Sequence, residues 1–251
     1  MKSVTYMLDA VIKSDTFGEF LEVIYSVVEE SKLKITKTGI TAKAMDAAHI
    51  AMVDASLSAE AFEKYTVEEC EIGVSINKLR EVVKLARAED SISIAYDGKM
   101  SSLKITIGNL VRDMSLINPS SISDAKMPSL ELIGSVIVGV NDLKQAIRGS
   151  ESISDHISLM LDKTCFSIGS EVDSADKLNM KIETSELKAL NAPDVIKSMY
   201  PIDYFSNMVK CIKSTDYVNI FFSSNYPLRM EFNFAGDKGA VRYLLAPRTS
   251  D

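Results

Sequence analysis

The chain has 251 residues, of which 46% are hydrophobic, and it carries 28 Lys and Arg against 35 Asp and Glu, a formal charge of -7. A chain of this length and hydrophobicity can bury a large core, which excludes disorder along its whole length. Evenly spread negative charge would repel a polyanion, so any nucleic-acid surface requires local sorting of the basic residues.

The first half of the chain predicts two helices among short strands. Residues 15–29 are predicted to be helical, because apolar residues such as Phe17, Phe20 and Ile24 recur at three- and four-residue spacing. Ser14 or Asp15 can cap the start of this helix. A second helix is predicted at residues 77–87, and strands are predicted at residues 32–37, 41–57, 70–76, 91–96 and 102–107.

The second half repeats this order of elements. Helices are predicted at residues 141–148 and 201–212, and strands at residues 156–162, around Phe166, and at 178–183, 217–223, 228–234 and 240–245. A shift of 126 residues places Val83 on Val209 and Ile92 on Val218 without a gap. The chain is therefore predicted to contain two halves of one topology.

Residues 118–132 (NPSSISDAKMPSLEL) contain two prolines and four serines without an apolar period, which is typical of an extended linker. We expect an N-terminal domain at residues 1–117, a connecting linker at 118–132 and a C-terminal domain at 133–251. Repeated hairpins favour an α+β fold of two topologically equivalent domains, each an antiparallel sheet with helices on one face. Two repeats leave sheet edges open, which ring formation with further subunits would protect.

Basic residues recur on one side of three predicted helices. The helical spacing of Lys84 and Arg87 puts both opposite the apolar side of their helix, whereas the first helix carries acidic residues such as Glu22. A merely solvated face is the alternative, but recurrence in both halves of an acidic chain favours weak, sequence-independent contacts with DNA phosphates. The predicted DNA-facing residues are Arg80, Lys84, Arg87, Lys144, Arg148, Lys210 and Lys213.

The sequence predicts no catalytic, metal or cofactor site. Cys70, Cys165 and Cys211 stand far apart without a CxxC pair, and the phosphate-loop, dinucleotide, zinc-protease and nucleophile-elbow motifs are absent. His156 follows Asp155, but neighbouring strand residues point to opposite faces, so we expect no acid–base pair there. Without a signal peptide or an apolar run near the ~20 residues that span a bilayer, we expect a soluble cytoplasmic protein that is not an enzyme.

Two segments resemble signatures of the proliferating cell nuclear antigen (PCNA) family of DNA sliding clamps, in its archaeal type. Residues 39–53 read GITAKAMDAAHIAMV and residues 243–248 read YLLAPR. The resemblance implies a homotrimeric ring, or a heterotrimer as in some archaea, that encircles double-stranded DNA and confers processivity in replication and repair. Helices would line the hole of the ring and a sheet would form its outside. The protein would then be found in the cytoplasm, associated with the nucleoid.

The resemblance also implies a pocket below the linker for a short peptide motif of DNA polymerase, clamp loader, flap endonuclease and DNA ligase. Its residues would be Met45, His49, Ile50, Met52, Met127, Pro128, Pro227, Leu244, Ala246 and Pro247. Subunits would pair edge to edge through residues 110–117 and 177–184. The apolar candidates there are Leu110, Leu116, Ile117, Leu178, Met180 and Ile182.

Two other functions remain open on the sequence. A protein-binding scaffold that never encircles DNA would leave the basic helix faces merely solvated, and a hydrolase of unrecognised mechanism could use some of the many carboxylates. Processive stimulation of a polymerase separates a clamp from both.

Overall fold

The structure is a computed structural model that describes residues 6–87, 89–98, 101–173 and 176–248. The chain divides into two compact units. Unit 1 comprises Met1–Met45, Val53–Lys126 and Asn233–Val241. Unit 2 comprises Asp46–Met52, Met127–Phe232 and Arg242–Asp251. Each unit therefore combines segments that are distant in the sequence.

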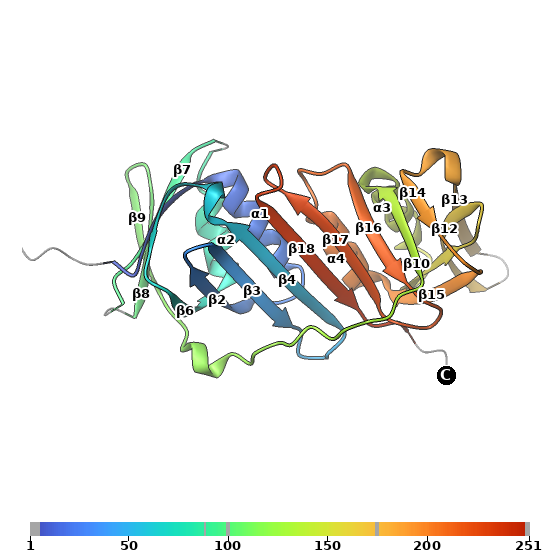
Figure 1. The fold of residues 1–251 in the computed structure, drawn as a ribbon, viewed down its shortest axis with the longest axis horizontal. Coiled ribbons are helices and arrows are strands. Elements are labelled where there is room, and N and C mark those ends of the chain that lie inside the picture. The colour runs from blue at the N-terminus through green and yellow to red at the C-terminus, as the bar shows by residue number, and fades with distance from the viewer. Residues whose placement is uncertain (1–5, 88, 99–100, 174–175, 249–251) are drawn as a thin grey trace, which may run out of the picture. The chain divides into compact units, whose positions relative to one another are not determined.

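Unit 1 is built from short antiparallel strands and helices (Figure 1). In chain order these are β1 (Leu8–Lys13), α1 (Ser14–Tyr25), β2 (Glu30–Thr36), β3 (Gly39–Met45), β4 (Ala51–Ser58), the 3-10 helix η1 (Ala59–Ala61), β5 (Phe62–Val67), β6 (Cys70–Ser75), α2 (Ile76–Val83), β7 (Ser91–Tyr96), β8 (Ser102–Ile107), β9 (Leu110–Ser115) and the 3-10 helix η2 (Pro119–Ser121). The strand orders are β5-β1-β7-β8-β9 and β4-β3-β2-β6.

Helix α1 packs beside α2 because each has a continuous apolar face. Phe17, Phe20 and Leu21 of α1 are almost fully buried, as are Leu79 and Val82 of α2. Alternating burial in β2 and β7 supplies the sheet side of the same core.

Unit 2 uses the same kinds of element. They are β10 (Gly134–Gly139), α3 (Val140–Ser150), β11 (His156–Leu161), β12 (Cys165–Asp173), β13 (Asp176–Glu183), the 3-10 helix η3 (Thr184–Glu186), β14 (Ala189–Asn191), β15 (Ile196–Pro201), α4 (Ile202–Lys210), β16 (Tyr217–Phe222), β17 (Leu228–Phe234) and β18 (Gly239–Leu245). The strand order β14-β10-β16-β17-β18 matches the first sheet of unit 1, and β13-β12-β11-β15 matches the second.

The 126-residue shift predicted from sequence extends to element bounds. Adding 126 to the ends of β1, β6 and β7 gives 134–139, 196–201 and 217–222, which are the bounds of β10, β15 and β16. The α+β prediction of repeated antiparallel sheets with a few helices is thereby confirmed.

Three predicted helices end earlier than expected, and among them α4 ends at Lys210 instead of residue 212. Helix α1 ends at Tyr25 instead of residue 29, and α2 ends at Val83 instead of residue 87. After α2 the amides of Leu85 and Ala86 donate to carbonyls three residues back, which tightens the chain into turns. The regular helical spacing assumed for Arg87 is therefore wrong, since this residue lies beyond the helix.

Candidate functional site

The predicted basic face of unit 1 is partly engaged by a carboxylate. Nη2 of Arg80 lies 2.7 Å from Oε2 of Glu22 on α1, and its guanidinium carbon lies 3.5 Å from the centre of the Tyr25 ring. The Arg80 side chain is only 13% exposed. The structure thus uses Arg80 to hold α1 against α2, a role that its helical spacing alone did not indicate.

Lys84 and Arg87 are more exposed than Arg80. Nζ of Lys84 lies 3.5 Å from Oε1 of Glu22, yet the lysine side chain is 62% exposed. Among the residues that the structure describes, no ion pair is found for the Arg87 side chain, while its backbone carbonyl accepts a hydrogen bond from Ser14 Oγ. Arg87 therefore presents its charge to solvent from a fixed backbone.

The predicted basic residues of unit 2 differ in the same way. Lys144 donates from Nζ to the carbonyl oxygen of Ile212 over 2.7 Å, and Arg148 donates from Nε to the Lys144 carbonyl. Lys210 pairs with Glu151 at 2.7 Å, and both Lys210 and Lys213 are exposed. Hydrogen bonds from Lys210 and then from Ser206 hold the pKa of Glu151 below its ordinary value.

A tight loop at residues 46–51 organises the predicted partner pocket. Oδ1 of Asp46 accepts hydrogen bonds from the amides of Ile50 and Ala51, and Oδ2 accepts one from the amide of Ala48. The hydroxyl of Tyr204 on α4 also donates to Oδ2, over 2.9 Å. Burial alone would raise the pKa of Asp46, but these donors outweigh it and lower the pKa.

The carboxyl-terminal segment lies along this loop. The amide of Ala246 donates to the carbonyl of Ile50 over 2.8 Å, which brings together two residues predicted for the pocket. His49 is exposed at the tip of the loop with φ 60°, a left-handed conformation that the hydrogen bonds to Asp46 stabilise. Pro227, Ala246 and Pro247 are half-buried, so parts of their side chains remain accessible.

Other predicted pocket residues are placed differently. Leu244 and Met52 are 5% and 8% exposed, so they belong to the floor more than to an accessible surface. Met127 is half-buried and Pro128 is exposed, and the described hydrogen bonds of the loop involve neither. Met45 is assigned to unit 1. Sequence reasoning missed Asp46 and Tyr204, although an Asp within residues 39–53 is a residue type that commonly caps its own turn.

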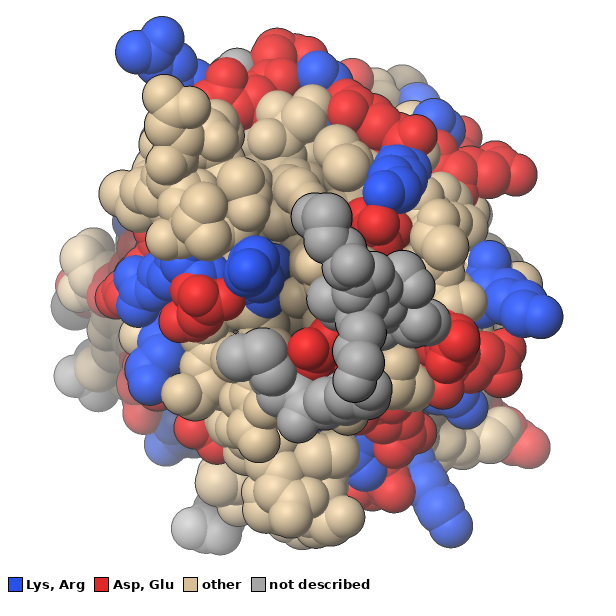
Figure 2. Space-filling model, turned by 90° about the vertical axis from the view of Figure 1, so that its left-hand side faces the viewer, with Lys and Arg blue, Asp and Glu red and all other residues tan. Residues whose placement is uncertain are grey.

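The residues predicted for the subunit edges differ in how exposed they are. Strands β9 and β13 stand at the ends of their strand orders, and Leu110 and Val111 of β9 are 38% and 58% exposed. Figure 2 views the side on which Figure 1 places β8 and β9, and uncharged residues are mixed there with charges of both signs. Val111 lies within the predicted segment 110–117 but was not named among its apolar candidates, although it is the more exposed of the two.

Leu116 and Ile117, which were also predicted for that edge, lie beyond the end of β9. Strand β9 ends at Ser115, and the amide of Ile117 donates instead to the carbonyl of Gly73 on β6. On β13, Met180 is half-buried and Ile182 is 5% exposed. Leu178 faces α3, because a Cβ at Gly149 would lie within 2.4 Å of its Cδ1.

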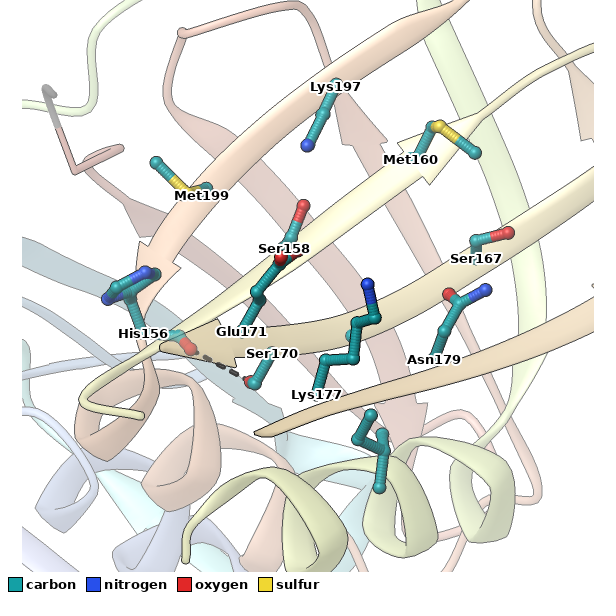
Figure 3. Close-up of a pocket in the computed structure, with 12 residues that line it drawn as sticks. His156, Ser158, Met160, Ser167, Ser170, Glu171, Lys177, Asn179, Lys197 and Met199 are labelled. Carbon is teal, nitrogen blue, oxygen red and sulfur yellow. Dashed lines mark hydrogen bonds between the residues drawn. The ribbon is translucent and has the colours of Figure 1, made fainter. Parts of the chain in front are cut away.

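A hollow of about 570 Å³ lies on the sheet β13-β12-β11-β15, at a place that the sequence did not predict. Figure 3 shows Lys177 and Lys197 pointing into it from the strands on either side. His156 lines one end, and its Nδ1 lies 2.8 Å from Oδ1 of Asp155. The argument that these neighbours point apart was wrong, because Asp155 precedes β11 instead of lying within it.

In the described ranges no group of three or more His, Cys, Asp or Glu side chains is arranged to hold a metal ion. Likewise, no helix in the part of the chain that the structure describes has the length and apolarity needed to cross a membrane.

Comparisons with known proteins agree along the chain. Residues 7–128 match the model of the proliferating cell nuclear antigen N-terminal domain. The DNA polymerase sliding clamp of Methanocella arvoryzae is 32% identical over 243 residues, which cover 96% of this chain and 98% of the relative.

Solved structures show the same likeness. A structure of the C-terminal region of FEN-1 bound to A. fulgidus PCNA has a TM-score of 0.91 at 28% identity, covering 98% of this chain and 100% of that chain. PCNA from Thermococcus kodakaraensis shares the fold, with a TM-score of 0.87 at 23% identity, covering 96% of this chain and all of that one.

Proposed function

The chain belongs to the proliferating cell nuclear antigen family of DNA polymerase sliding clamps, and from this premise we propose that three copies close into a ring around duplex DNA and tether a polymerase to it. The resemblance to that family, stated above from the sequence, is confirmed. The clamp works by topological linkage and has no catalytic step of its own. We expect the protein to act on chromosomal DNA, in the nucleoid of an archaeal cell.

The observation that carries the ring is an equivalence between strand edges. β18 is hydrogen-bonded to β4, and residues 239–241 of β18 belong to the same compact unit as residues 53–58 of β4. In the repeat, β13 is the counterpart of β4, since residues 51–58 shifted by 126 become 177–184. β9 is the counterpart of β18, because β9 forms a hairpin with β8 and β18 forms the equivalent hairpin with β17.

β9 and β13, which stand at the ends of their strand orders, are therefore the counterparts of β18 and β4, which are paired with each other. We propose that β9 of one subunit joins β13 of the next in the manner of β18 and β4. Because the two edges differ, the contact is head-to-tail, and its rotation closes a ring. Exposed Leu110 and Val111 would be covered at each junction.

The DNA contacts that we propose are individually weak. Arg87 and Arg148, with Lys84, Lys210 and Lys213, would meet phosphates without reading bases, while Lys144 and Arg80 mainly hold their own units together. Such contacts are sensitive to salt and independent of sequence, which allows a ring to move along the duplex.

The partner site that we propose is the loop at residues 46–51 together with residues 244–248. A relative with this fold is bound to the C-terminal region of FEN-1, which supports a peptide site of this kind. Clients would include polymerase, clamp loader, flap endonuclease and ligase, and tethering would raise their local concentration at DNA. We retain residues 1–117, 118–132 and 133–251 as the domains and linker of this assembly.

Two measurements test the proposal. Light scattering should give a mass near three chains over a range of concentrations, and Val111→Lys on the exposed edge should reduce the mass to that of one chain. The protein threaded onto linear duplex with biotin ends should be retained after streptavidin blocks the ends and lost from unblocked DNA. A persistent monomer that binds client peptides but is not retained would identify a protein-binding scaffold instead.

A further inference from the structure

In each unit, two equivalent positions contact a carboxylate, one within the second helix and one at its carboxyl-terminal end. In unit 1, Glu22 contacts Arg80 at 2.7 Å and Lys84 at 3.5 Å. Adding 126 to these two partners gives residues 206 and 210. In unit 2, Oε1 of Glu151 accepts a hydrogen bond from Ser206 Oγ over 2.6 Å and one from Lys210 Nζ over 2.7 Å.

The two carboxylates are not themselves equivalent by the repeat. Glu151 shifted back by 126 falls on Tyr25, and Glu22 shifted forward falls on Arg148. One carboxylate lies within α1, and the other follows the last residue of α3. Each unit therefore places a carboxylate beside the same two helix positions, but the carboxylate comes from a different position in each unit. The contact is thus not a residue pair that both halves share through the repeat.

Each carboxylate contacts one buried side chain and one exposed lysine. Arg80 is 13% exposed and stacks on Tyr25, and Ser206 is 2% exposed, so both hold their carboxylate in place. The lysines are 62% and 55% exposed, and their flexible stems can carry the ammonium away from the carboxylate. Glu22 and Glu151 are only 19% and 36% exposed, but an ion pair whose lysine is largely in solvent contributes little to stability. The ion pairs to Lys84 and Lys210 are therefore expected to stabilise their units only weakly.

We propose that Glu22 and Glu151 act as internal substitutes for DNA phosphates. Each holds its lysine when no phosphate is near and releases it when one arrives, so part of the gain from every phosphate contact is offset by breaking the pair with the carboxylate. The result is an affinity low enough for movement along DNA. This inference rests on the proposed clamp function and names the residues that regulate its grip.

The test combines Glu22→Gln with Glu151→Gln. A glutamine oxygen still accepts hydrogen bonds from Arg80 and Ser206, while the negative charge that competes with phosphate is removed. The matched control is Glu60→Gln with Glu69→Gln, which removes the same charge from exposed residues in η1 and in the segment between β5 and β6. If Glu22→Gln unfolds the protein because the charge of Arg80 is no longer compensated, Glu151→Gln alone tests the inference against Glu69→Gln alone.

Duplex affinity is measured across a salt series on DNA with open ends, and one-dimensional diffusion is followed by single-molecule tracking of protein on end-blocked DNA. The plot of log affinity against log salt should steepen by about 0.9 for each additional phosphate neutralised, and diffusion should slow at least about two-fold. Adding Lys84→Ala and Lys210→Ala to the double variant should abolish both changes.

The possible failures are distinguishable. If the glutamine variant matches its control in salt slope and diffusion, the inference is overturned while the clamp function stands. If it differs but the added lysine substitutions leave the gain intact, the lysines are not the released groups and the inference is again overturned. If the unmodified protein is not retained by blocked ends, the proposed clamp function itself fails.

Discussion

The hydroxyl of Tyr204 donates a 2.9 Å hydrogen bond to Oδ2 of Asp46, which ties helix α4 to the loop at residues 46–51. The same carboxylate accepts three backbone amides of that loop. Because Asp46 is 9% exposed, its charge depends on these donors for compensation. One residue thus connects the shape of the candidate partner site to the packing of unit 2.

Removing either partner should loosen the loop. Tyr204→Phe should lower the free energy of unfolding by about 1–2 kcal/mol, and Asp46→Asn by about 2–3 kcal/mol, because amide donors of the loop lose a charged acceptor. Both should weaken a client peptide that binds beside residues 244–248. Urea unfolding and fluorescence titration measure the two effects, with Tyr217→Phe on an exposed ring as the control. Unchanged peptide affinity in both variants would show that the hydrogen bonds to Asp46 do not shape the client-peptide site.

Asp46 should also give stability a specific pH dependence. Its pKa is lowered below the usual 3.8 in the folded protein, so its contribution is present above the unfolded value and is lost as pH falls through the folded one. The difference in urea midpoint between the parent and Asp46→Asn should therefore be constant near neutral pH and shrink below about pH 4. A difference that grew on acidification would contradict the assigned direction.

The repeat shows how far the sequence could predict the fold. Strands β7, β8 and β17 were predicted with the bounds that the structure has, because alternation and turn residues mark them. β14 has three residues, too few to show a period, and β15 ends in a proline. β1 (LDAVIK) and β10 (GSVIVG) were not predicted either, because six residues with so few apolar side chains are ambiguous when each segment is considered alone. The 126-residue shift relates the two segments and could have identified both.

The candidate sites were harder to predict, because periodicity gives the face of a helix and not its neighbour. Lys84 and Arg80 fall on one face by spacing, but only the packing of α1 brings Glu22 to them. The fold of the 46–51 loop depends on α4, which is more than 150 residues away in the chain. Such long-range partners leave no local signal in a single sequence.

The beginning of the linker should respond to one methyl group. A Cβ at Gly73 would lie 2.5 Å from the carbonyl oxygen of Ile117, too close for a normal contact. Gly73→Ala should therefore displace Ile117 and destabilise the protein by about 1–3 kcal/mol, with faster hydrogen exchange at the Ile117 amide.

Gly18→Ala is the matched control for that substitution. Its Cβ would meet Val83 at 3.5 Å, an ordinary contact, within helix α1. Alanine should stabilise the helix there by up to about 1 kcal/mol. Equal destabilisation by both substitutions would show that the Gly73 effect is not specific to the linker.

The arginines should separate into two groups by function. Arg87→Ala with Arg148→Ala removes exposed charges, so DNA retention should weaken and the salt slope should flatten by about 0.9 for each phosphate that is no longer neutralised, with unfolding and trimer mass unchanged. Arg80→Ala removes the partly buried partner of Glu22 and should lower the free energy of unfolding by about 3 kcal/mol. Lys37→Ala, at the exposed turn between β2 and β3, controls for the removal of one positive charge. If Arg80→Ala instead flattened the salt slope while keeping full stability, Arg80 would be a DNA contact and its assignment as a tie between helices would be wrong.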